Sequence, residues 1–358
     1  MFLTHLEIQH VRNLASEKLE CDPGINLILG ANAAGKTAVL EAIHLLSAAR
    51  SFRTPRAREV IQYGRESLLV TANLVDQHRN TISAGIEKGR SQTQIRFKGQ
   101  KVGRRSEQIQ NIPVISIVPE TLNLLSAAPK TRRHWLDWAL FHVEPRYFSH
   151  WHAYHQALRQ RNALLRQGKL EIDALEIWEG VMVENAGRLR QPRREYLKVL
   201  RERLQEIAGN MFRGIELQLK TPDENDERLQ EDLRMHRHAD ARMGHTQSGP
   251  HRMDVGIVCN GRPAAQTLSR GEGKRLLILL MLAQAAEYRA IKKQAPILLV
   301  DDLAAELDSD AMKSVLELLY GQEMQAFITA ISADPIVGFI PEYSVFHVEH
   351  GCLQKMVN

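Results

Sequence analysis

The chain has 358 residues, which is too long for one ordinary domain and predicts two or three. Its three cysteines, Cys21, Cys259 and Cys352, are widely spaced and form no C-x-x-C pair, which argues against both a disulfide framework and a zinc site. A formal net charge of +5 permits nucleic-acid binding without demonstrating it, so any such function has to rest on how the basic residues cluster.

No segment predicts secretion or membrane insertion. The first residues lack a basic stretch followed by a long apolar run, which a signal peptide would need. The longest apolar run, residues 276–283, is far shorter than the roughly 20 residues of a transmembrane helix, so we expect a buried helix there. A reducing cytoplasm is the expected location.

The first strong pattern is a strand, a glycine loop and a helix. Residues 25–29 are apolar and follow Pro23-Gly24, which predicts a buried strand. Residues 30–37 fit G-x-x-x-x-G-K-[ST], the P-loop pattern, and residues 38–46 place their apolar side chains on one helical face. The alternative is a glycine-rich turn before a core helix. The flanking strand and helix favour the P-loop.

A P-loop predicts a site for a nucleotide triphosphate. Glycine allows backbone conformations in which successive N–H groups converge on phosphate oxygens at a helix N-terminus. Lys36 would place its charge at the β and γ phosphates and is also a candidate catalytic group, and the Thr37 hydroxyl would ligate Mg²⁺. The predicted nucleotide contacts are Gly30, Ala31, Asn32, Ala33, Ala34, Gly35, Lys36 and Thr37.

The rest of the first third of the chain has strand character. Alternating apolar residues or a short apolar run predict strands at residues 2–9, 68–74, 81–86, 94–97 and 112–118. Residues 98–103 predict a hairpin turn.

Helical periodicity begins near residue 122 and continues to about residue 211, which predicts an inserted and mainly helical domain, with two antiparallel helices as one arrangement. Gly168 and Pro192 are predicted breaks within it. Strand character returns at residues 215–219, and the acidic segment 221–227 predicts a solvated surface.

A second half of the nucleotide site follows near the C-terminus. Residues 296–300 are apolar and end in Asp301-Asp302, which is the Walker B pattern. Asp301 would hold Mg²⁺ directly or through water, and Asp302 is the candidate general base for the attacking water. Alone the pattern is weak, because acids at a strand end often cap the next turn. Paired with a P-loop, it becomes specific.

Residues 268–275 open a helix and resemble the LSGGQ-type signature of ABC ATPases. The resemblance implies that this loop contacts the γ-phosphate held by a partner subunit, through Ser269, Gly271 and Glu272. The alternative is a capping box between Ser269 and Glu272, and both interpretations can hold. ABC ATPases usually carry a switch histidine near residues 329–333, where this chain offers only Thr329 or Ser332 as candidates.

The order of these motifs is that of SMC and Rad50-like ATPase heads, and within that group the chain resembles the RecF family along its whole length. The P-loop has Ala33-Ala34 where that family often carries glycine and serine, and Glu272 where glutamine is common. The resemblance rests on residues 11–14, 30–37, 49–53, 118–120, 132–137, 248–254 and 268–275.

The resemblance implies an α/β fold, an ABC-type P-loop ATPase head split by the inserted, mainly helical second domain. The expected parts are an N-terminal ATPase lobe at residues 1–121, the insertion at 122–211 and a C-terminal ATPase lobe at 212–358. The resemblance also implies nucleotide contacts from Arg12 and Asn13.

The functions implied by the resemblance concern DNA repair. They are ATP and Mg²⁺ binding, weak DNA-dependent ATP hydrolysis used as a dimerisation switch, and binding to duplex or gapped DNA and to single–double-strand junctions. The implied partners are RecR and RecO, and the outcome is loading of RecA in recombinational repair and replication restart. An ABC-type subunit of a membrane transporter is the alternative, since it shares the same motifs.

Two basic clusters are candidate DNA contacts, because side chains of this kind neutralise phosphates without reading bases. Solvated helix and hairpin surfaces are the alternative. The first cluster, on the predicted hairpin, consists of Arg96, Lys98, Lys101 and Arg104. The second cluster repeats at helical spacing and consists of Arg190, Arg194, Lys198 and Arg201.

Overall fold

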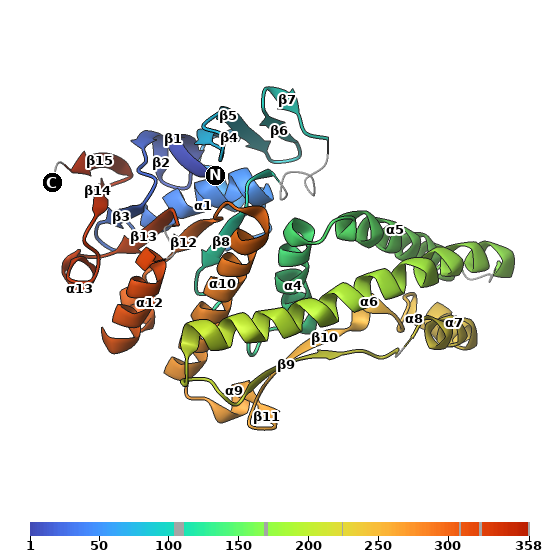
Figure 1. Ribbon diagram of the computed structural model, residues 1–358. Helices are drawn as coiled ribbons and strands as arrows, with labels where there is room; N and C mark the ends of the chain where they lie inside the picture. Colours follow the sequence, from blue (N-terminus) through green and yellow to red (C-terminus); the bar gives the residue numbers. More distant parts are fainter. Residues whose placement is uncertain (104–110, 168–170, 224, 308, 322–323, 357–358) are drawn as a thin grey trace. The chain divides into compact units, whose positions relative to one another are not determined.

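A computed structural model describes residues 1–103, 111–167, 171–223, 225–307, 309–321 and 324–356 (Figure 1). The chain divides into two compact units. Unit 1 combines Met1–Asn123 with Ser269–Asn358, and unit 2 is Leu124–Leu268. Segments from both ends of the sequence therefore build unit 1.

The central sheet of unit 1 has six strands in the order β15-β14-β3-β13-β12-β8. The five strands from β14 to β8 run parallel, and β15 pairs antiparallel with β14 at one edge. Parallel strands are covered on both faces and are therefore almost wholly apolar. The bounds are β3 (Ile25–Leu29), β8 (Val114–Ile117), β12 (Ile297–Val300), β13 (Ala326–Ala330), β14 (Tyr343–Glu349) and β15 (Cys352–Met356).

Strand β3 is the N-terminal contribution to the middle of this sheet. It lies between β13 and β14, with Leu27 opposite Ile328 on one side and Val345 on the other. The strand that leads into residues 30–37 is thus held by strands from more than 290 positions later in the chain. The predicted strand at 25–29 is confirmed.

A second sheet of unit 1 is antiparallel, in the order β2-β1-β4-β5-β6-β7. Burial alternates along β4, where Leu68, Val70, Ala72 and Leu74 face the core. One face of such a sheet packs inside and the other meets solvent. The bounds are β1 (Phe2–Val11), β2 (Leu14–Glu20), β4 (Ser67–Val75), β5 (Thr81–Gly89), β6 (Thr93–Phe97) and β7 (Gln100–Lys101).

Helix α1 (Lys36–Ala48) packs against strands of both sheets, including β1 and β4 of one and β13 and β8 of the other (Figure 1). Most of its residues are buried, as expected for a helix between two layers. The other helices of unit 1 are α2 (Ala57–Val60), α10 (Arg270–Lys292), α11 (Leu303–Glu306), α12 (Ser309–Gly321) and α13 (Asp334–Val337).

Helix α10 contains the apolar run 276–283, and all eight of its side chains are buried. The expected buried helix is therefore confirmed. Across the described ranges, no helix has the length and apolarity that crossing a membrane requires.

Unit 2 is mainly helical, and its long helices α5 and α6 pack along one another. Strands β9, β10 and β11 form a small separate sheet. The bounds are α4 (Pro129–Val143), α5 (Tyr147–Leu165), α6 (Ile172–Ala208), β9 (Ile215–Lys220), α7 (Asp226–Met235), α8 (Arg237–Met243), the 3₁₀ turn η1 (Pro250–Arg252), β10 (Asp254–Cys259), β11 (Arg262–Pro263) and α9 (Ala264–Thr267).

The end of unit 2 differs from the expected boundary at residue 211. The predicted strand at 215–219 exists as β9, but it pairs antiparallel with β10, so residues up to Leu268 belong to unit 2. Strand character alone does not reveal which sheet a strand joins. Unit 1 resumes only at Ser269, the N-cap residue of α10.

The predicted break at Pro192 is wrong, because α6 continues through it from Ile172 to Ala208. Proline removes one backbone hydrogen bond and usually bends or ends a helix. Here buried arginines hold the helix on both sides. Arg190 pairs with Asp223, and Arg193 pairs with Asp137 at 2.8 Å. The other predicted break, Gly168, lies outside the described residues.

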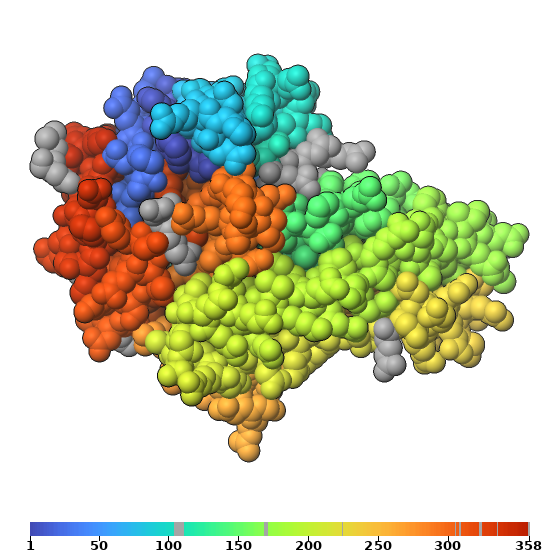
Figure 2. All heavy atoms as spheres, viewed as in Figure 1, coloured from blue at the N-terminus to red at the C-terminus, as the bar shows by residue number. Residues whose placement is uncertain are grey.

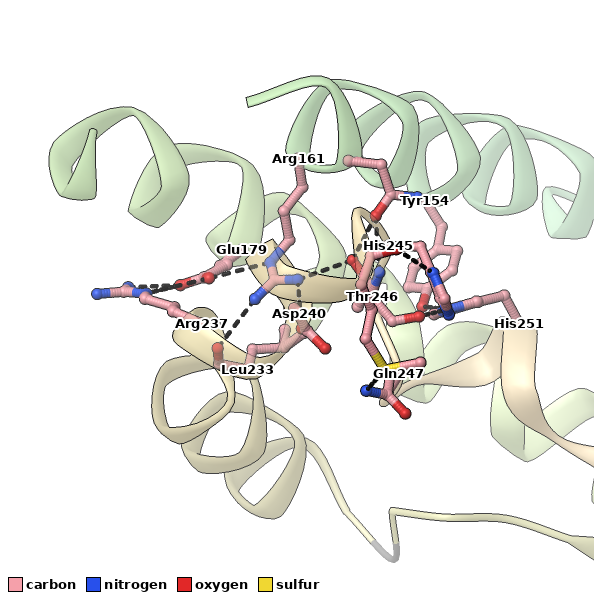
Figure 3. Close-up of polar contacts among 12 residues, drawn as sticks. Tyr154, Arg161, Glu179, Leu233, Arg237, Asp240, His245, Thr246, Gln247 and His251 are labelled. Atoms are coloured by element: carbon pink, nitrogen blue, oxygen red, sulfur yellow. Dashed lines mark hydrogen bonds and ion pairs between the residues drawn. The ribbon is translucent and has the colours of Figure 1, made fainter. Parts of the chain in front are cut away.

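A buried ion network joins α5, α6 and α8 in unit 2 (Figure 3). The Arg161 guanidinium has no exposed surface and donates to Glu179 at 3.0 Å, to Asp240 at 2.7 Å and to the Leu233 carbonyl at 2.9 Å. Arg237 shares the Glu179 carboxylate. Removing one member of such a network leaves a buried charge without compensation.

Arg161→Met should therefore destabilise the protein by about 3–5 kcal/mol, because Asp240 is 1% exposed and loses its cation. Arg159→Met, on the exposed side of the same helix, is the matched control and should change stability by less than about 0.5 kcal/mol. Urea unfolding of both variants measures the difference. Equal midpoints would show that the network does not stabilise unit 2.

Candidate nucleotide-binding site

The loop between β3 and α1 has the backbone that its glycines allow. Gly30 has φ 156° and Gly35 has φ 125°. A Cβ on Gly30 would lie 2.3 Å from the Val348 carbonyl oxygen, and one on Gly35 would lie 3.0 Å from the Leu14 side chain. Both positions need glycine for close approach as well as for conformation.

The Lys36 ammonium lies inside the curve of this loop. It donates to the Gly30 carbonyl at 2.8 Å and to the Ala31 carbonyl at 2.9 Å, and the residue is 8% exposed. An ammonium has three N–H donors. Its charge is therefore held where the loop N–H groups and the start of α1 also favour an anion.

The residues predicted from the resemblance at the end of β1 support the loop. Asn13 donates through its amide to the Ala34 carbonyl at 2.9 Å. Arg12 makes a two-pronged pair with Glu41 on α1, at 2.8 and 2.9 Å, and the Glu41 side chain is fully buried. The structure thus gives Arg12 and Asn13 a positioning role, and their contact with nucleotide stays a prediction.

Walker A and Walker B meet through hydroxyl and carboxylate groups. The Thr37 hydroxyl lies 3.0 and 3.1 Å from the two oxygens of Asp301. Hydroxyl and carboxylate oxygens are hard ligands of the kind that Mg²⁺ prefers, and the two side chains converge on one point. These residues fit the predicted metal site.

Thr329 on the neighbouring strand β13 completes this arrangement. Its hydroxyl is buried, donates to Asp301 at 2.7 Å and accepts from the backbone N–H of Asp302 at 2.9 Å. Asp302 has φ 49°, an uncommon conformation for a residue other than glycine. Thr329 therefore orients the Asp301 carboxylate and holds the backbone of Asp302 at once.

The sequence named Thr329 and Ser332 only as substitutes for a switch histidine. The structure instead places Thr329 on the Walker B turn, while Ser332 is exposed. No local pattern around Thr329 indicates this role. Only the parallel pairing of β12 with β13, which brings Val300 opposite Ile328, places its hydroxyl beside Asp301.

The signature segment forms the capping box that was its alternative interpretation. The Ser269 hydroxyl accepts from the Glu272 N–H at 3.3 Å, and the Glu272 carboxylate accepts from the Ser269 N–H at 2.8 Å and from its hydroxyl at 2.7 Å. Hydrogen bonds from Ser269 lower the pKa of Glu272. Within the described part of the chain, no hydrogen bond joins Ser269, Gly271 or Glu272 to the P-loop.

The signature helix is nevertheless tied to the segment after Walker B. Lys274 in its first turns forms an ion pair with Glu306 of α11. Arg275 donates to the Ser314 hydroxyl of α12 at 3.2 Å. A change in the conformation of residues 301–306 would therefore reach the start of α10 directly.

The hairpin cluster is partly described. Arg96, Lys98 and Lys101 are exposed on β6, on β7 and at the turn between them, whereas Arg104 lies outside the described residues. On α6, Arg194, Lys198 and Arg201 are also exposed.

The interpretation of Arg190 as a DNA contact is wrong. Its side chain is buried, pairs with Asp223 and with Asp226 at 2.9 Å, and so has no charge to offer to a phosphate. Asp223 is fully buried too, although its acidic segment was predicted to be solvated. The helical spacing of the basic residues does not distinguish the buried Arg190 from its exposed neighbours. The acids of the downstream segment, Asp223 and Asp226, were the sequence signal that Arg190 has partners within the chain.

Comparison with known proteins defines the class first. The family model described as RecF/RecN/SMC N terminal domain matches residues 2–354. The SMC head structure bound to the C-winged helix domain of ScpA has a TM-score of 0.58 and 14% identity, covering 99% of this chain and 97% of that one, and supports the fold alone. The chain is an SMC-type head, and the predicted α/β fold class is confirmed.

Similarity to curated relatives then gives the family. The chain is 37% identical to DNA replication and repair protein RecF of Pseudomonas fluorescens, over 98% of this chain and 97% of the relative. For the same protein of Marinobacter nauticus the identity is 36%, over 99% and 100%. A structure of the recombination mediator RecF with ATP, from the RecFOR pathway, has a TM-score of 0.89 and 26% identity, with coverages of 99% and 98%. The chain belongs to the RecF family of DNA replication and repair proteins.

The P-loop carries one residue that its conformation does not favour. Ala33 has φ 65°, in the left-handed region, which costs an ordinary residue about 1–2 kcal/mol. Ala33→Gly should relieve this strain, but the glycine also raises the conformational entropy of the unfolded chain and so offsets part of the gain. The free energy of unfolding should therefore stay unchanged or rise by up to about 1 kcal/mol.

The matched control is Ala38→Gly, a buried position within α1 that should lose about 0.5–1 kcal/mol. Thermal unfolding of the two variants measures the contrast. If Ala33→Gly destabilises the protein as much as Ala38→Gly, then the left-handed conformation of Ala33 stores no strain.

Proposed function

We propose that this protein binds ATP with Mg²⁺ at the site formed by the P-loop and Walker B, hydrolyses it slowly, and uses it to control dimerisation on DNA during recombinational repair. The observation that carries this proposal is the contact of Thr37 with Asp301, held by Thr329. It brings a phosphate loop and a metal ligand together in one compact unit. The RecF–ATP structure of a 26% identical relative supports the choice of nucleotide.

Each residue has a distinct role in the proposal. Lys36 binds the β and γ phosphates together with the loop N–H groups of residues 30–37. Thr37 and Asp301 hold Mg²⁺, which neutralises phosphate charge when bound. Asp302 orients and deprotonates the attacking water, from a turn that the Thr329 hydroxyl fixes.

The signature segment supports a slow reaction at a composite site. In the proposal, Ser269 and Gly271 of one subunit contact the γ-phosphate bound by the other. The Ser269 hydroxyl donates a hydrogen bond to the Glu272 carboxylate of its own capping box, and that carboxylate would repel a phosphate. Reaching the γ-phosphate requires exchange of that bond, so Glu272 should limit how readily the dimer closes.

The DNA and protein partners follow from family membership. Relatives are described as DNA replication and repair proteins, and a solved relative as a recombination mediator of the RecFOR pathway. We therefore propose gapped DNA and single–double-strand junctions as substrates, RecR and RecO as partners, RecA loading as the outcome and the cytoplasm as the location. The match to RecF along nearly the whole chain disfavours the transporter subunit.

The composite site can be tested by mixing two inactive variants. Lys36→Met removes the P-loop charge, and Ser269→Arg places a bulky cation where the γ-phosphate should lie. In a two-fold symmetric mixed dimer, one site carries both defects and the other carries none. Random pairing makes half of the dimers mixed, with half of their sites intact, so about a quarter of wild-type ATPase activity is the expected maximum.

The measurement is steady-state ATP hydrolysis on gapped DNA, with mixed dimers verified by differently tagged subunits. The matched control carries Lys36→Met and Ser269→Arg on the same chain. It should stay inactive when mixed with an equal amount of either single variant, because every site then carries at least one defect. No recovery from verified mixed dimers would contradict independent sites in trans, and full activity of Ser269→Arg alone would refute the composite site.

A further inference from the structure

Unit 1 contains a basic pocket away from the P-loop. Its volume is about 520 Å³, and one wall is the segment after α1 while the other is the turn between β5 and β6. Five cationic side chains line it, and none of its lining residues is acidic. They are Arg50, Arg56, Arg58, Lys88 and Arg90. A concave site with one sign of charge concentrates the field on an anion.

Three of these cations keep their charge available. Among the described residues, Arg50, Arg58 and Arg90 form no ion pair within 4 Å, and all three are exposed. Glu59 lies beside this wall, where hydrogen bonds from Thr54 and Arg56, and then the charges of Arg56 and Arg58, lower the pKa of its carboxyl. Arg56 is compensated by Glu59 at 3.0 Å. Lys88 is 6% exposed and donates to the Ala49 carbonyl at 3.0 Å, which fixes the end of β5 to the end of α1. The wall is thus rigid and its arginines are solvated.

The wall on the α1 side is also ordered by specific hydrogen bonds. The Ser51 hydroxyl accepts from the N–H groups of Arg53 at 2.9 Å and Thr54 at 3.1 Å, and it donates to Glu41 of α1. Burial, and after it the Arg50 charge, lower the pKa of His44 to about 3. A neutral His44 adds no charge of its own.

Further basic residues lie on the same sheet, where Arg96 and Lys101 pair on the solvent-facing side, opposite the face that carries Lys88 and Thr93. Strand β6 pairs with β5 and β7, and Arg96, Lys98 and Lys101 are exposed on that hairpin. Figure 2 shows the segment from β4 to β7 at the surface of unit 1, in light blue and cyan. A small anion needs only one cluster of cations, whereas an exposed pocket with further cations on the adjoining hairpin also suits a polyanion.

We propose that this pocket binds a backbone phosphate of duplex DNA, with Arg58 and Arg90 as its principal contacts. The assignment rests on the proposed DNA-binding function and adds a location to it. Arginine suits the role, because its planar guanidinium stays charged and can bind phosphate in a two-pronged manner. The contact would position the duplex without reading its sequence.

The test compares the Arg58→Ser/Arg90→Ser double variant with wild type, by fluorescence anisotropy of a labelled gapped duplex in the presence of ATP and Mg²⁺ over a series of salt concentrations. The slope of log affinity against log salt should become shallower by roughly one for each phosphate contact removed. Two single variants give the matched control, Arg90→Ser in the pocket and Arg79→Ser outside it. Arg79 is exposed just before β5 begins, at the end of that strand opposite to Arg90. Calorimetric ATP affinity should be the same in all variants.

The outcomes separate this inference from the proposed function. A weaker and less salt-dependent double variant, with Arg79→Ser like wild type, supports the pocket. If wild type binds DNA but the double variant matches it, the pocket assignment is wrong and the proposed function stands. If wild type binds no DNA in any nucleotide state, both are overturned. Calorimetric binding of inorganic phosphate that the double variant loses, with DNA affinity unchanged, would assign the pocket to a small anion and overturn the DNA contact.

Discussion

The site depends on one set of hydrogen bonds, those that join Thr37 and Thr329 to the Asp301 carboxylate. They connect residues 264 positions apart, on α1 and at the end of β12, with Thr329 contributed by the adjacent strand β13. The parallel pairing of β3, β13 and β12 makes the contact possible, because it brings the carboxyl ends of these strands to one edge of the sheet. The half-buried Asp301 carboxylate is strongly oriented because it accepts hydrogen bonds from both threonine hydroxyls, and Asp302 follows it with its backbone N–H bonded to the same Thr329.

Much of this could be predicted from the sequence, and the reasons for success are local. A P-loop is recognised by its glycines, its lysine and the flanking strand and helix. A Walker B strand is recognised by four apolar residues before two acids. The role of Thr329 could not be predicted, since it depends on which strand lies beside β12. For the same reason β9 was recognised as a strand but assigned to the wrong part of the chain. Pairing between distant segments is the information that a local pattern lacks.

Charge was the least reliable guide. Arg190 has the spacing of an exposed basic face, yet it is buried against Asp223 and Asp226, and the same pairing helps to carry α6 through Pro192. Unit 2 uses Arg161 and Arg193 in the same way, as buried ions satisfied by carboxylates. Arginines that retain exposed charge, such as Arg58 and Arg90, are therefore better candidates for phosphate contacts than arginines chosen by number or spacing.

The central claim is that the Thr329 hydroxyl positions the Walker B acids for hydrolysis, and replacing it tests that claim most directly. Thr329→Val keeps the shape but removes the hydroxyl, whereas Thr329→Ser restores it. Steady-state ATP hydrolysis on gapped DNA should show kcat lowered on the order of 10- to 100-fold in Thr329→Val, with KM little changed, and most of the activity retained in Thr329→Ser. Thermal unfolding of both variants separates this effect from a loss of fold. Wild-type kcat in a folded Thr329→Val protein would contradict the account.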